Sequence, residues 1–447
     1  MTEESTTYDR LVHNGRIVTV NGDFDILDRG WVGITDGRIA SVGQLAEGNL
    51  LPPALHTTDA RDGIVMPGLV NTHTHLPMTL FRGLADDLPL QTWLQEHIFP
   101  AETRHINPET VEAGALLGCA EMLLGGTTTC CDGYFLEDVV AEAVQAAGLR
   151  GVLGQGVIDF PAPGVPDCSR NIDQALAYVA RWQNADPLIS PSIFCHSPYT
   201  CSAETLQNAK RAADRHGLLF QIHAAETRDE CDRIQAEQGV TVIRYLDRLG
   251  LLDHNTLLVH GVWMDEEEME LIARRGSRLS HNPQSNMKLA AGIAPIPQAI
   301  AAGITVGLGT DGCASNNNLD LFEEMDAAAK LHKVRHLDPT VMDAATVLRM
   351  ATIEGARAIG LNGEVGSLEV GKQADLIILD GRRASLVPIY NPVSHIVYAA
   401  HGGHVRDVVV GGRLLVCEGR LMDMDLEGIM ARVNRIADAI RSGKNGP

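Results

Sequence analysis

Met66-Pro-Gly-Leu-Val-Asn-Thr-His-Thr-His75 is the stretch of sequence that decides the fold. Its apolar residues lead into two histidines, His73 and His75, which are separated by one residue. On a β-strand this spacing puts both imidazoles on one face, close enough to share one metal ion. Pro67-Gly68 allows the chain to turn as it enters the strand. Two histidines on a half-exposed strand would give the same pattern, so the choice depends on the rest of the chain.

The residues that follow alternate predicted strands with predicted helices. Eight short apolar segments occur, and most precede a stretch with the 3.6-residue periodicity of a helix, which is typical of a (β/α)8 barrel. A doubly wound open sheet is the alternative, but it normally has fewer strands, and the sequence has no G-x-x-x-x-G-K-[ST] phosphate loop. The predicted strands are Gly68–Thr74, Gly126–Asp132, Gly151–Ile158, Ile189–His196, Leu218–His223, Thr256–His260, Ser277–His281 and Ile304–Thr310.

Both ends of the chain show the pattern of short β-strands. Near the N-terminus, dipeptides typical of hairpin turns separate four such segments. The segments are Asp9–His13, Arg16–Thr19, Trp31–Thr35 and Arg38–Val42, with predicted turns at Asn14-Gly15, Asn21-Gly22 and Asp36-Gly37. Near the C-terminus, strands are predicted at Ala374–Leu379, Val405–Val410 and Arg413–Cys417, before a surface helix at Leu426–Ser442.

The length of 447 residues suggests one large domain with a smaller one, because a single core rarely grows to this size. Chain ends often lie close together, so we expect the two terminal segments to form one small β-sandwich. The expected domains are the N-terminal part of the sandwich at 1–65, the barrel at 66–368, and the C-terminal part with its helix at 369–447.

Composition excludes several classes of partner and compartment. The net charge of −21 disfavours nucleic acid and anionic membrane surfaces, since both would repel the protein. Nine cysteines without regular spacing do not resemble a disulfide framework. The N-terminal residues lack the pattern of a signal peptide, and no apolar run reaches the length of a membrane span. We expect a soluble, cytoplasmic homo-oligomer that binds a small molecule.

Histidines and carboxylates recur where the predicted strands end. In a (β/α)8 barrel the catalytic groups gather at these carboxyl ends. Seventeen histidines placed at random would not be expected to fill so many of them. The strand-end residues are His73 and His75, His196, His223 with Glu226 beyond it, His260, His281 and Asp311.

Three imidazoles and one carboxylate suit Zn²⁺ with water in an open position. We assign His73, His75, His223 and Asp311 as ligands of one zinc ion per subunit, with Fe²⁺ or another divalent metal as the alternative. Bound zinc lowers the pKa of water toward roughly 7. A second metal would need a bridging group, and the fourth strand has no lysine to supply one.

Two further residues are candidates for proton transfer. Glu226 leaves the strand top three residues after His223 and is placed to shuttle protons, while His260 is placed to hold the nucleophile. Each candidate has a simpler interpretation: Glu226 only caps the next helix, His260 is a core histidine, and Asp311-Gly312 is only a turn. For His281 the choice between packing and site remains open.

Five longer motifs resemble a known family. Together with the metal pattern they are similar to the amidohydrolase superfamily and, more narrowly, to 5′-methylthioadenosine/S-adenosylhomocysteine deaminases, over nearly the whole chain. The motifs lie at residues 75–88, 93–102 (Trp-Leu-Gln-Glu-His-Ile-Phe-Pro-Ala-Glu), 196–200 (His-Ser-Pro-Tyr-Thr), 280–289 (Ser-His-Asn-Pro-Gln-Ser-Asn-Met-Lys-Leu) and 309–318 (Gly-Thr-Asp-Gly-Cys-Ala-Ser-Asn-Asn-Asn).

The resemblance implies a zinc-dependent hydrolytic deaminase on a (β/α)8 barrel with a β-sandwich built from both ends. It implies metal ligands at the same four positions and substrate contacts at Glu102, His196, Glu226 and Asp311. Glu102 is placed to accept both ribose hydroxyls, and Glu226 to protonate a purine nitrogen while hydroxide adds to C6. The alternatives are another adenosine analogue, a free purine or a triazine as substrate, and a barrel that only binds.

One position departs from the family and bears on the substrate. Some members present arginines from the third strand and the loop after it to an amino-acid carboxylate. Here Gln155 stands at the strand position, and Arg170 in the loop aligns only loosely. Glutamine is a poor substitute for a bidentate arginine. We therefore hypothesise that methylthioadenosine is preferred over S-adenosylhomocysteine.

Overall fold

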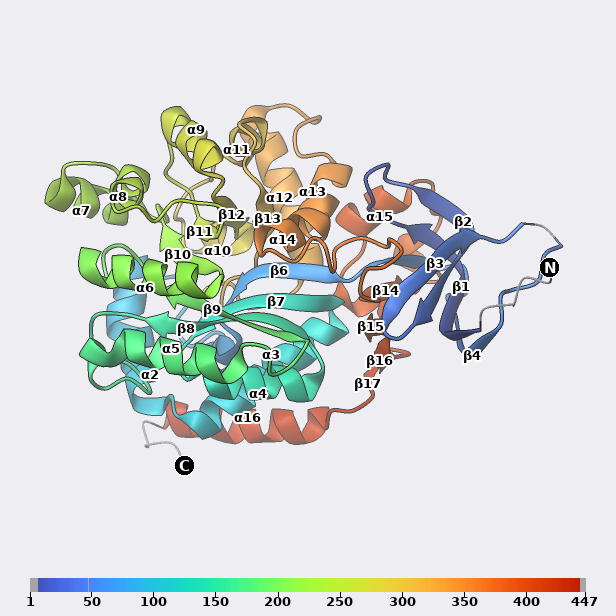
Figure 1. The fold of residues 1–447 in the computed structure, drawn as a ribbon, viewed down its shortest axis with the longest axis horizontal. Coiled ribbons are helices and arrows are strands. Elements are labelled where there is room, and N and C mark those ends of the chain that lie inside the picture. Colours follow the sequence, from blue (N-terminus) through green and yellow to red (C-terminus); the bar gives the residue numbers. More distant parts are fainter. Residues whose placement is uncertain (1–6, 47, 443–447) are drawn as a thin grey trace.

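Eight parallel strands form a nearly closed barrel, which makes up the larger part of the molecule (Figure 1). The computed structural model describes residues 7–46 and 48–442. Neighbouring strands follow one another in chain order around the barrel, which confirms the predicted architecture. The strands are β6 (Leu69–Thr74), β7 (Thr127–Tyr134), β8 (Arg150–Val157), β9 (Ile189–Cys195), β10 (Phe220–Ala224), β11 (Thr256–His260), β12 (Arg278–His281) and β13 (Val306–Leu308).

The first and last barrel strands meet through the residues at their carboxyl ends. The backbone carbonyl of His73 accepts hydrogen bonds from the N–H groups of Thr310 (3.1 Å) and Asp311 (3.0 Å). The side chain of Asn71 adds a hydrogen bond to the Thr310 hydroxyl at 2.7 Å. These contacts bring the end of β6 next to the loop that follows β13, so two distant parts of the sequence supply one site.

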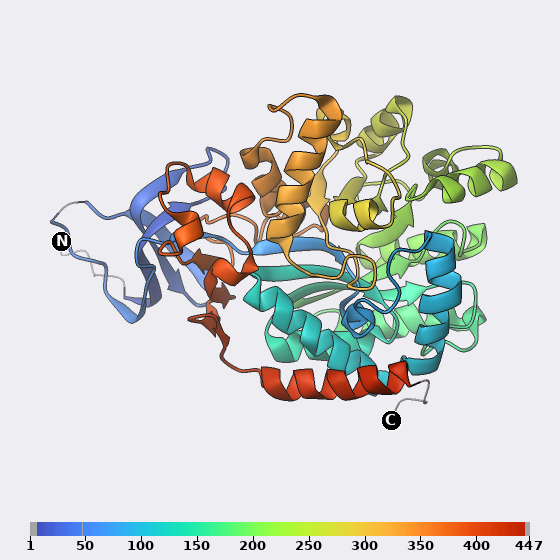
Figure 2. The same ribbon diagram turned by 180° about the vertical axis from the view of Figure 1, so that it is seen from behind.

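Helices cover the outside of the barrel (Figures 1 and 2). Because the strands are covered by these helices on one face and by the barrel interior on the other, nearly all of their residues are buried, including the polar ones. The longer helices are α3 (Pro108–Leu124), α4 (Glu137–Ala147), α5 (Asn171–Trp182), α6 (Ala203–His216), α7 (Arg228–Gln238), α9 (Glu266–Arg275), α12 (Leu321–His336) and α16 (Leu426–Arg441). The shorter ones are α1 (Leu90–Thr92), α2 (Phe99–His105), α8 (Val242–Arg248), α10 (Pro283–Lys288), α11 (Ile296–Ala301), α13 (Ala344–Met350), α14 (Ile353–Ala358) and α15 (Pro392–Tyr398).

A second sheet of nine strands lies beside the barrel and is built from both ends of the chain, as expected. Strands β5 and β14 join the two ends, with Val65 opposite Ile378 in an antiparallel ladder. The strands from the N-terminal end are β1 (Tyr8–Val18), β2 (Ile26–Thr35), β3 (Arg38–Gln44), β4 (Ala54–Asp59) and β5 (Ile64–Pro67). Those from the C-terminal end are β14 (Leu376–Leu379), β15 (Val405–Val410), β16 (Arg413–Cys417) and β17 (Arg420–Leu421).

The predicted turn at Asn14-Gly15 is wrong. Strand β1 runs through both residues, and its pairing with β2 shifts register on either side of Gly15, which marks a β-bulge. Asn14 takes the bulge conformation with φ +56°, and its amide donates to Asp59 at 2.9 Å. Gly15 packs so closely on Val65 that an added Cβ would lie 2.7 Å from a methyl carbon. Contacts with a distant strand therefore decide this local conformation.

Gly68 separates the two sheets at the residue where β5 gives way to β6. A Cβ on Gly68 would lie 2.1 Å from the side chain of Thr128, so only glycine permits the close approach of β6 to β7. The chain passes from the terminal sheet into the barrel within this one residue. The strand that leads to His73 therefore begins at a residue that is packed tightly against β7.

The C-terminal helix α16 lies along the barrel, against α3 (Figure 2). The Arg432 guanidinium pairs with Glu112 at 2.8 Å and donates to the carbonyl of Glu109 at 2.8 Å. Among residues 7–46 and 48–442, no helix is both long enough and apolar enough to span a membrane. All nine cysteines fall in this described part, and none forms a disulfide.

Candidate active site

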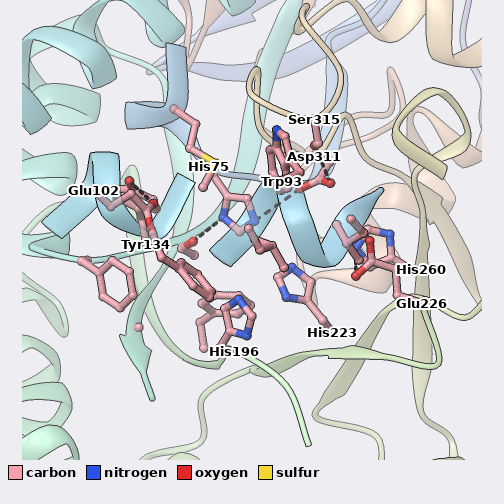
Figure 3. A pocket seen from close by; sticks show the side chains of 18 of the residues that line it. His75, Trp93, Glu102, Tyr134, His196, His223, Glu226, His260, Asp311 and Ser315 are labelled. Atoms are coloured by element: carbon pink, nitrogen blue, oxygen red, sulfur yellow. Dashed lines mark hydrogen bonds and ion pairs between the residues drawn. The ribbon is translucent and has the colours of Figure 1, made fainter. Parts of the chain in front are cut away.

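A pocket opens at the carboxyl ends of the barrel strands (Figure 3). Its apolar walls include Trp93 and Phe99 from the segment after β6, and its polar groups come from almost every strand end. The polar lining residues are His75, Glu102, Tyr134, His196, Tyr199, His223, Glu226, His260, Asp311 and Ser315.

Four buried side chains converge at the bottom of this pocket. His73, His75, His223 and Asp311 each offer one ligand atom, and these four atoms lie within 4.8 Å of one another. The Oδ1 atom of Asp311 lies 3.3 Å from Nε2 of His75 and 3.5 Å from Nε2 of His73. The Nε2 atoms of His73 and His223 are 3.1 Å apart. The structure thus brings together all four residues that the sequence proposed as ligands.

The pKa shifts of three of these four side chains suit a cation; for His75, burial lowers the pKa, but the neighbouring Asp311 carboxylate raises it above its ordinary value. Burial lowers the pKa of His73 to about 3 and holds that of His223 well below its ordinary value, so both imidazoles are neutral. Burial opposes ionisation of Asp311, but hydrogen bonds to His73 and His75 hold its pKa well below the usual range. Neutral imidazoles with one carboxylate are the donor set that zinc prefers, so these residues fit one zinc ion.

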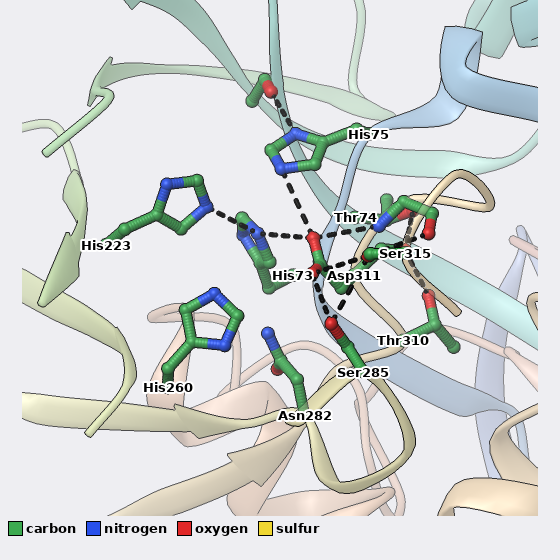
Figure 4. A network of polar contacts seen from close by, with 12 residues as sticks. His73, Thr74, His75, His223, His260, Asn282, Ser285, Thr310, Asp311 and Ser315 are labelled. Carbon is green, nitrogen blue, oxygen red and sulfur yellow. Dashed lines mark hydrogen bonds and ion pairs between the residues drawn. The ribbon is translucent and has the colours of Figure 1, made fainter. Parts of the chain in front are cut away.

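Neighbouring groups fix the orientation of two of the four side chains (Figure 4). Nδ1 of His75 lies 2.6 Å from the Gly133 carbonyl, so this nitrogen carries the proton and leaves Nε2 free as a ligand. The other carboxylate oxygen of Asp311 accepts hydrogen bonds from the hydroxyls of Ser285 (2.7 Å) and Ser315 (2.8 Å). Both serines lie in the motifs at 280–289 and 309–318, although the sequence did not single them out.

Glu226 lies beside His260, with its Oε2 atom 3.8 Å from Nε2 of the imidazole (Figure 3). Nδ1 of His260 is 2.9 Å from the side-chain oxygen of Asn286, which directs Nε2 into the pocket. Burial raises the pKa of the Glu226 carboxyl, which favours the protonated form. Helix α7 is capped by Thr227, so Glu226 does not serve as the cap.

Backbone strain coincides with two of these residues. His260 has φ +76° and Asp311 has φ +61°, in the left-handed region that few residues other than glycine adopt. Such conformations tend to occur where the surrounding structure holds a functional side chain in place. Asp311 is therefore more than an ordinary turn residue, because its strained backbone directs the carboxylate toward His73 and His75.

Glu102 lies at the other side of the pocket, away from Glu226 (Figure 3). It is held on α2 and is only 3% exposed. The Tyr134 hydroxyl donates to its Oε1 atom at 2.5 Å, and burial raises the pKa of the Glu102 carboxyl to about 7. Tyr134 was not predicted from the sequence, although it directly follows Asp132-Gly133 at the end of β7, a strand that contains no histidine.

The segment over the pocket contains a turn of π-helix. Residues Trp93–Ile98 form it, between α1 and α2, and Trp93 and Leu94 line the pocket directly. π-Helical turns occur often at functional sites. His196 faces the same space: its Nδ1 lies 3.1 Å from the Thr200 hydroxyl, and burial lowers its pKa to about 3, so the ring is neutral.

Three other candidate residues lie outside the pocket. The Gln155 side chain accepts from the N–H of Glu137 at 3.2 Å and does not line the pocket. Arg170 is 64% exposed and lies 3.9 Å from Asp173. His281 is fully buried with its Nε2 atom 3.4 Å from that of His332, so it packs behind the site.

Comparison with known proteins gives full-length matches. The family model described as "Amidohydrolase family" matches residues 64–415. A 5-methylthioadenosine/S-adenosylhomocysteine deaminase of Syntrophobacter fumaroxidans is 47% identical over 437 residues, covering 98% of this chain and 99% of that protein. A 5′-deoxyadenosine deaminase of Methanosarcina barkeri is 42% identical over 435 residues, covering 97% and 98%.

A crystal structure of an adenosine deaminase from Xanthomonas campestris with bound zinc is also similar. Its TM-score is 0.95 at 39% identity, and the match covers 98% of this chain and 99% of that one. These matches confirm the resemblance seen in the sequence motifs. A nearly closed barrel, a buried group of three histidines and one aspartate, and a family match over most of the sequence lead to one conclusion: the chain belongs to the amidohydrolase family.

Proposed function

We propose that this protein is a zinc-dependent deaminase that hydrolyses the C6 amino group of adenosine-type thioether nucleosides, giving the inosine analogue and ammonia. The observation that carries the proposal is the separation of two carboxyls in one pocket: Glu102 is buried, and the Glu226 side chain is only 12% exposed. Glu226 lies with the metal-binding group, and Glu102 lies on the opposite side of His75 (Figure 3). A nucleoside has a reactive base at one end and ribose hydroxyls at the other, which matches this arrangement. The names of the two relatives and of the similar crystal structure agree with this substrate class.

The proposed chemistry assigns one role to each side chain. His73, His75, His223 and Asp311 hold zinc, which supplies the Lewis acidity that makes water nucleophilic at neutral pH. The Glu226 carboxyl donates its proton to the purine N1 as water oxygen adds to C6. Asp311 accepts a proton from the attacking water, and His260 orients that water through Nε2. Asp311 then gives this proton to the amino group, which leaves C6 as ammonia, while the proton of the new C6 hydroxyl passes back to Glu226 and the C6 carbonyl forms.

The walls of the pocket complete the proposal. His196 faces the purine ring as a neutral imidazole, and Glu102 accepts hydrogen bonds from the ribose hydroxyls. Trp93 and Phe99 exclude water above the substrate. The decisive experiment is a panel of adenosine analogues, free bases and triazines incubated with zinc-loaded protein, with ammonia release measured. Release from none of them would favour a barrel that only binds.

Glu102→Ala is expected to lower kcat/KM for methylthioadenosine by about 10²-fold or more. A hydrogen bond to a charged group contributes about 1.5–3 kcal/mol, and the alanine variant would lose the two hydrogen bonds between the Glu102 carboxylate and the ribose hydroxyls. The measurement is steady-state ammonia release with methylthioadenosine and with its analogue that lacks both ribose hydroxyls, for which the variant should change little. Tyr134→Phe, which removes only one contact to Glu102, should have a smaller effect. Unchanged kcat/KM in Glu102→Ala would favour a free base or a triazine as substrate.

Methylthioadenosine is expected to have a higher kcat/KM than S-adenosylhomocysteine. Among the described residues that line the pocket, none is arginine or lysine, so the amino-acid carboxylate would lack a cationic partner there. The absence of a single bidentate contact to the carboxylate should lower kcat/KM for S-adenosylhomocysteine by about tenfold or more. The check is a direct comparison of the two substrates under one condition, and a clear preference for the homocysteine adduct would contradict the proposal. The cytoplasmic location and the homo-oligomeric state stay predictions.

A further inference from the structure

The turn that carries Glu226 has an unusual backbone. Strand β10 ends at Ala224 and α7 begins at Arg228, so only residues 225–227 connect them. Ala225 takes the left-handed conformation with φ +53°, which is unfavourable for a residue with a Cβ. The carbonyl of Ala225 bonds to the segment that follows β11: it accepts hydrogen bonds from the N–H groups of Val262 and Trp263, both at 2.9 Å. Those bonds leave the N–H groups of the turn to be satisfied elsewhere.

A single buried carboxylate satisfies two of them. Oε1 of Glu230 accepts from the N–H of Ala225 at 3.1 Å, and Oε2 accepts from the N–H of Glu226 at 2.7 Å. Glu230 is itself only 3% exposed, and its own N–H donates to the Thr227 hydroxyl at 3.2 Å. It does not line the pocket. Glu230 therefore touches the backbone of Glu226 but no group that would meet the substrate.

We propose that Glu230 is the positioning residue for Glu226. Its two oxygens match two successive N–H groups, and they hold the strained turn so that the Glu226 carboxyl stays beside His260 and over the metal-binding group. The inference rests on the proposed role of Glu226 in proton transfer. Glutamine, which has the same size, cannot make both bonds in this way, because it offers one acceptor and one donor and the donor would face an N–H.

The effect of losing Glu230 should fall on kcat. Contacts that do not involve Glu230 hold His223 in place. Its strand β10 pairs with β9 and β11, and the backbone N–H of His223 donates to the His196 carbonyl at 3.2 Å. Zinc content and KM should therefore stay within about twofold in Glu230→Gln. A proton donor displaced by about 1 Å costs as much as 10²-fold, so kcat should fall by about 10- to 100-fold. Glu230→Asp, which keeps the carboxyl group with its two oxygens but is one methylene shorter, should show a smaller fall, and it carries the test if the glutamine variant does not fold.

Glu268→Gln is a matched control. Glu268 is also buried (2% exposed), accepts a backbone N–H (from Asp265, 2.9 Å) at the start of the helix after the next strand, and does not line the pocket. This variant should lose thermal stability without losing kcat. If Glu268→Gln lowers kcat as much as Glu230→Gln does, the effect is a general loss of stability, and the positioning role is wrong.

The double variant Glu226→Gln/Glu230→Gln separates this inference from the proposed function. If Glu230 acts through Glu226, the double variant should have the kcat of Glu226→Gln alone, within about twofold. Multiplied losses would overturn the positioning role, as would a kcat within twofold of wild type in Glu230→Gln. If Glu226→Gln itself keeps wild-type kcat, the proposed proton transfer fails instead.

Discussion

Glu226→Gln is expected to lower kcat for methylthioadenosine by about 10²- to 10⁴-fold, the usual range for loss of a general acid–base group. Glutamine keeps the size of the side chain and its place beside His260, but it has no acidic proton to give to the purine ring. Burial raises the pKa of Glu226, which shifts its titration toward the protonated form that the proposed step requires. KM should change little, because the ribose and the metal-binding group are untouched.

Steady-state ammonia release, with zinc content measured on the same samples, tests this expectation. Asp232→Asn is a suitable control, since Asp232 lies on α7 close to Glu226 in sequence but its side chain is 72% exposed. The control should keep wild-type kcat. A Glu226→Gln enzyme with more than a tenth of wild-type kcat and normal zinc content would show that proton transfer occurs through another group.

Asp311→Asn is expected to lower both zinc content and kcat/KM, the latter by about 10³-fold or more. Asp311 supplies the only carboxylate of the metal-binding group, and its substitution also removes the proposed proton acceptor. Treatment of the wild-type protein with a chelator should abolish ammonia release, and one equivalent of zinc per chain should restore it. Thermal unfolding should occur at a lower temperature without zinc, because a ligand that binds only the folded state stabilises it.

Metal analysis, activity and thermal unfolding of the same preparations check these effects together. Asp438→Asn, an exposed position on α16, makes the same chemical change far from the pocket and should leave all three unchanged. Full activity after exhaustive chelation, with no zinc detected, would exclude the proposed metal chemistry. Retention of one zinc per chain by Asp311→Asn would instead show that the three histidines suffice to bind it.

The barrel could be predicted from sequence because its strands are buried on both faces. Segments such as Gly151–Ile158, in which Gln155 is the one polar residue, stand out from the amphipathic helices between them, and the observed β8 differs by one residue at each end. Strand β4 was not predicted, since most of its residues are exposed and carry no hydrophobic pattern. Gly307-Leu-Gly-Thr-Asp-Gly312 fits the G-x-G-x-x-G spacing, yet no helix begins after it until α12. Short patterns therefore identify structure only within the right context.

For the site, sequence could place residues at strand ends but could not orient them. Barrel geometry placed His73, His75, His223 and Asp311 at strand ends, together with other histidines, and the donor preference of zinc and the family resemblance indicated these four as ligands. The hydrogen bond from Tyr134 to Glu102 depends on how α2 packs over the barrel, and no local pattern encodes that contact. The π-helical turn at Trp93–Ile98 has no distinctive sequence either.

The pairing of β5 with β14 has a consequence for how the chain folds during synthesis. Val65 emerges early from the ribosome, whereas its partner Ile378 emerges only after the whole barrel. Until then β5 has one unpaired edge, and exposed strand edges invite aggregation. Strand β5 leads directly into β6, which carries His73 and ends just before His75, so the sheet beside this motif is complete only after β14 has been synthesised. A nascent chain that stops before residue 376 thus has every proposed zinc ligand but lacks β14, the partner of β5.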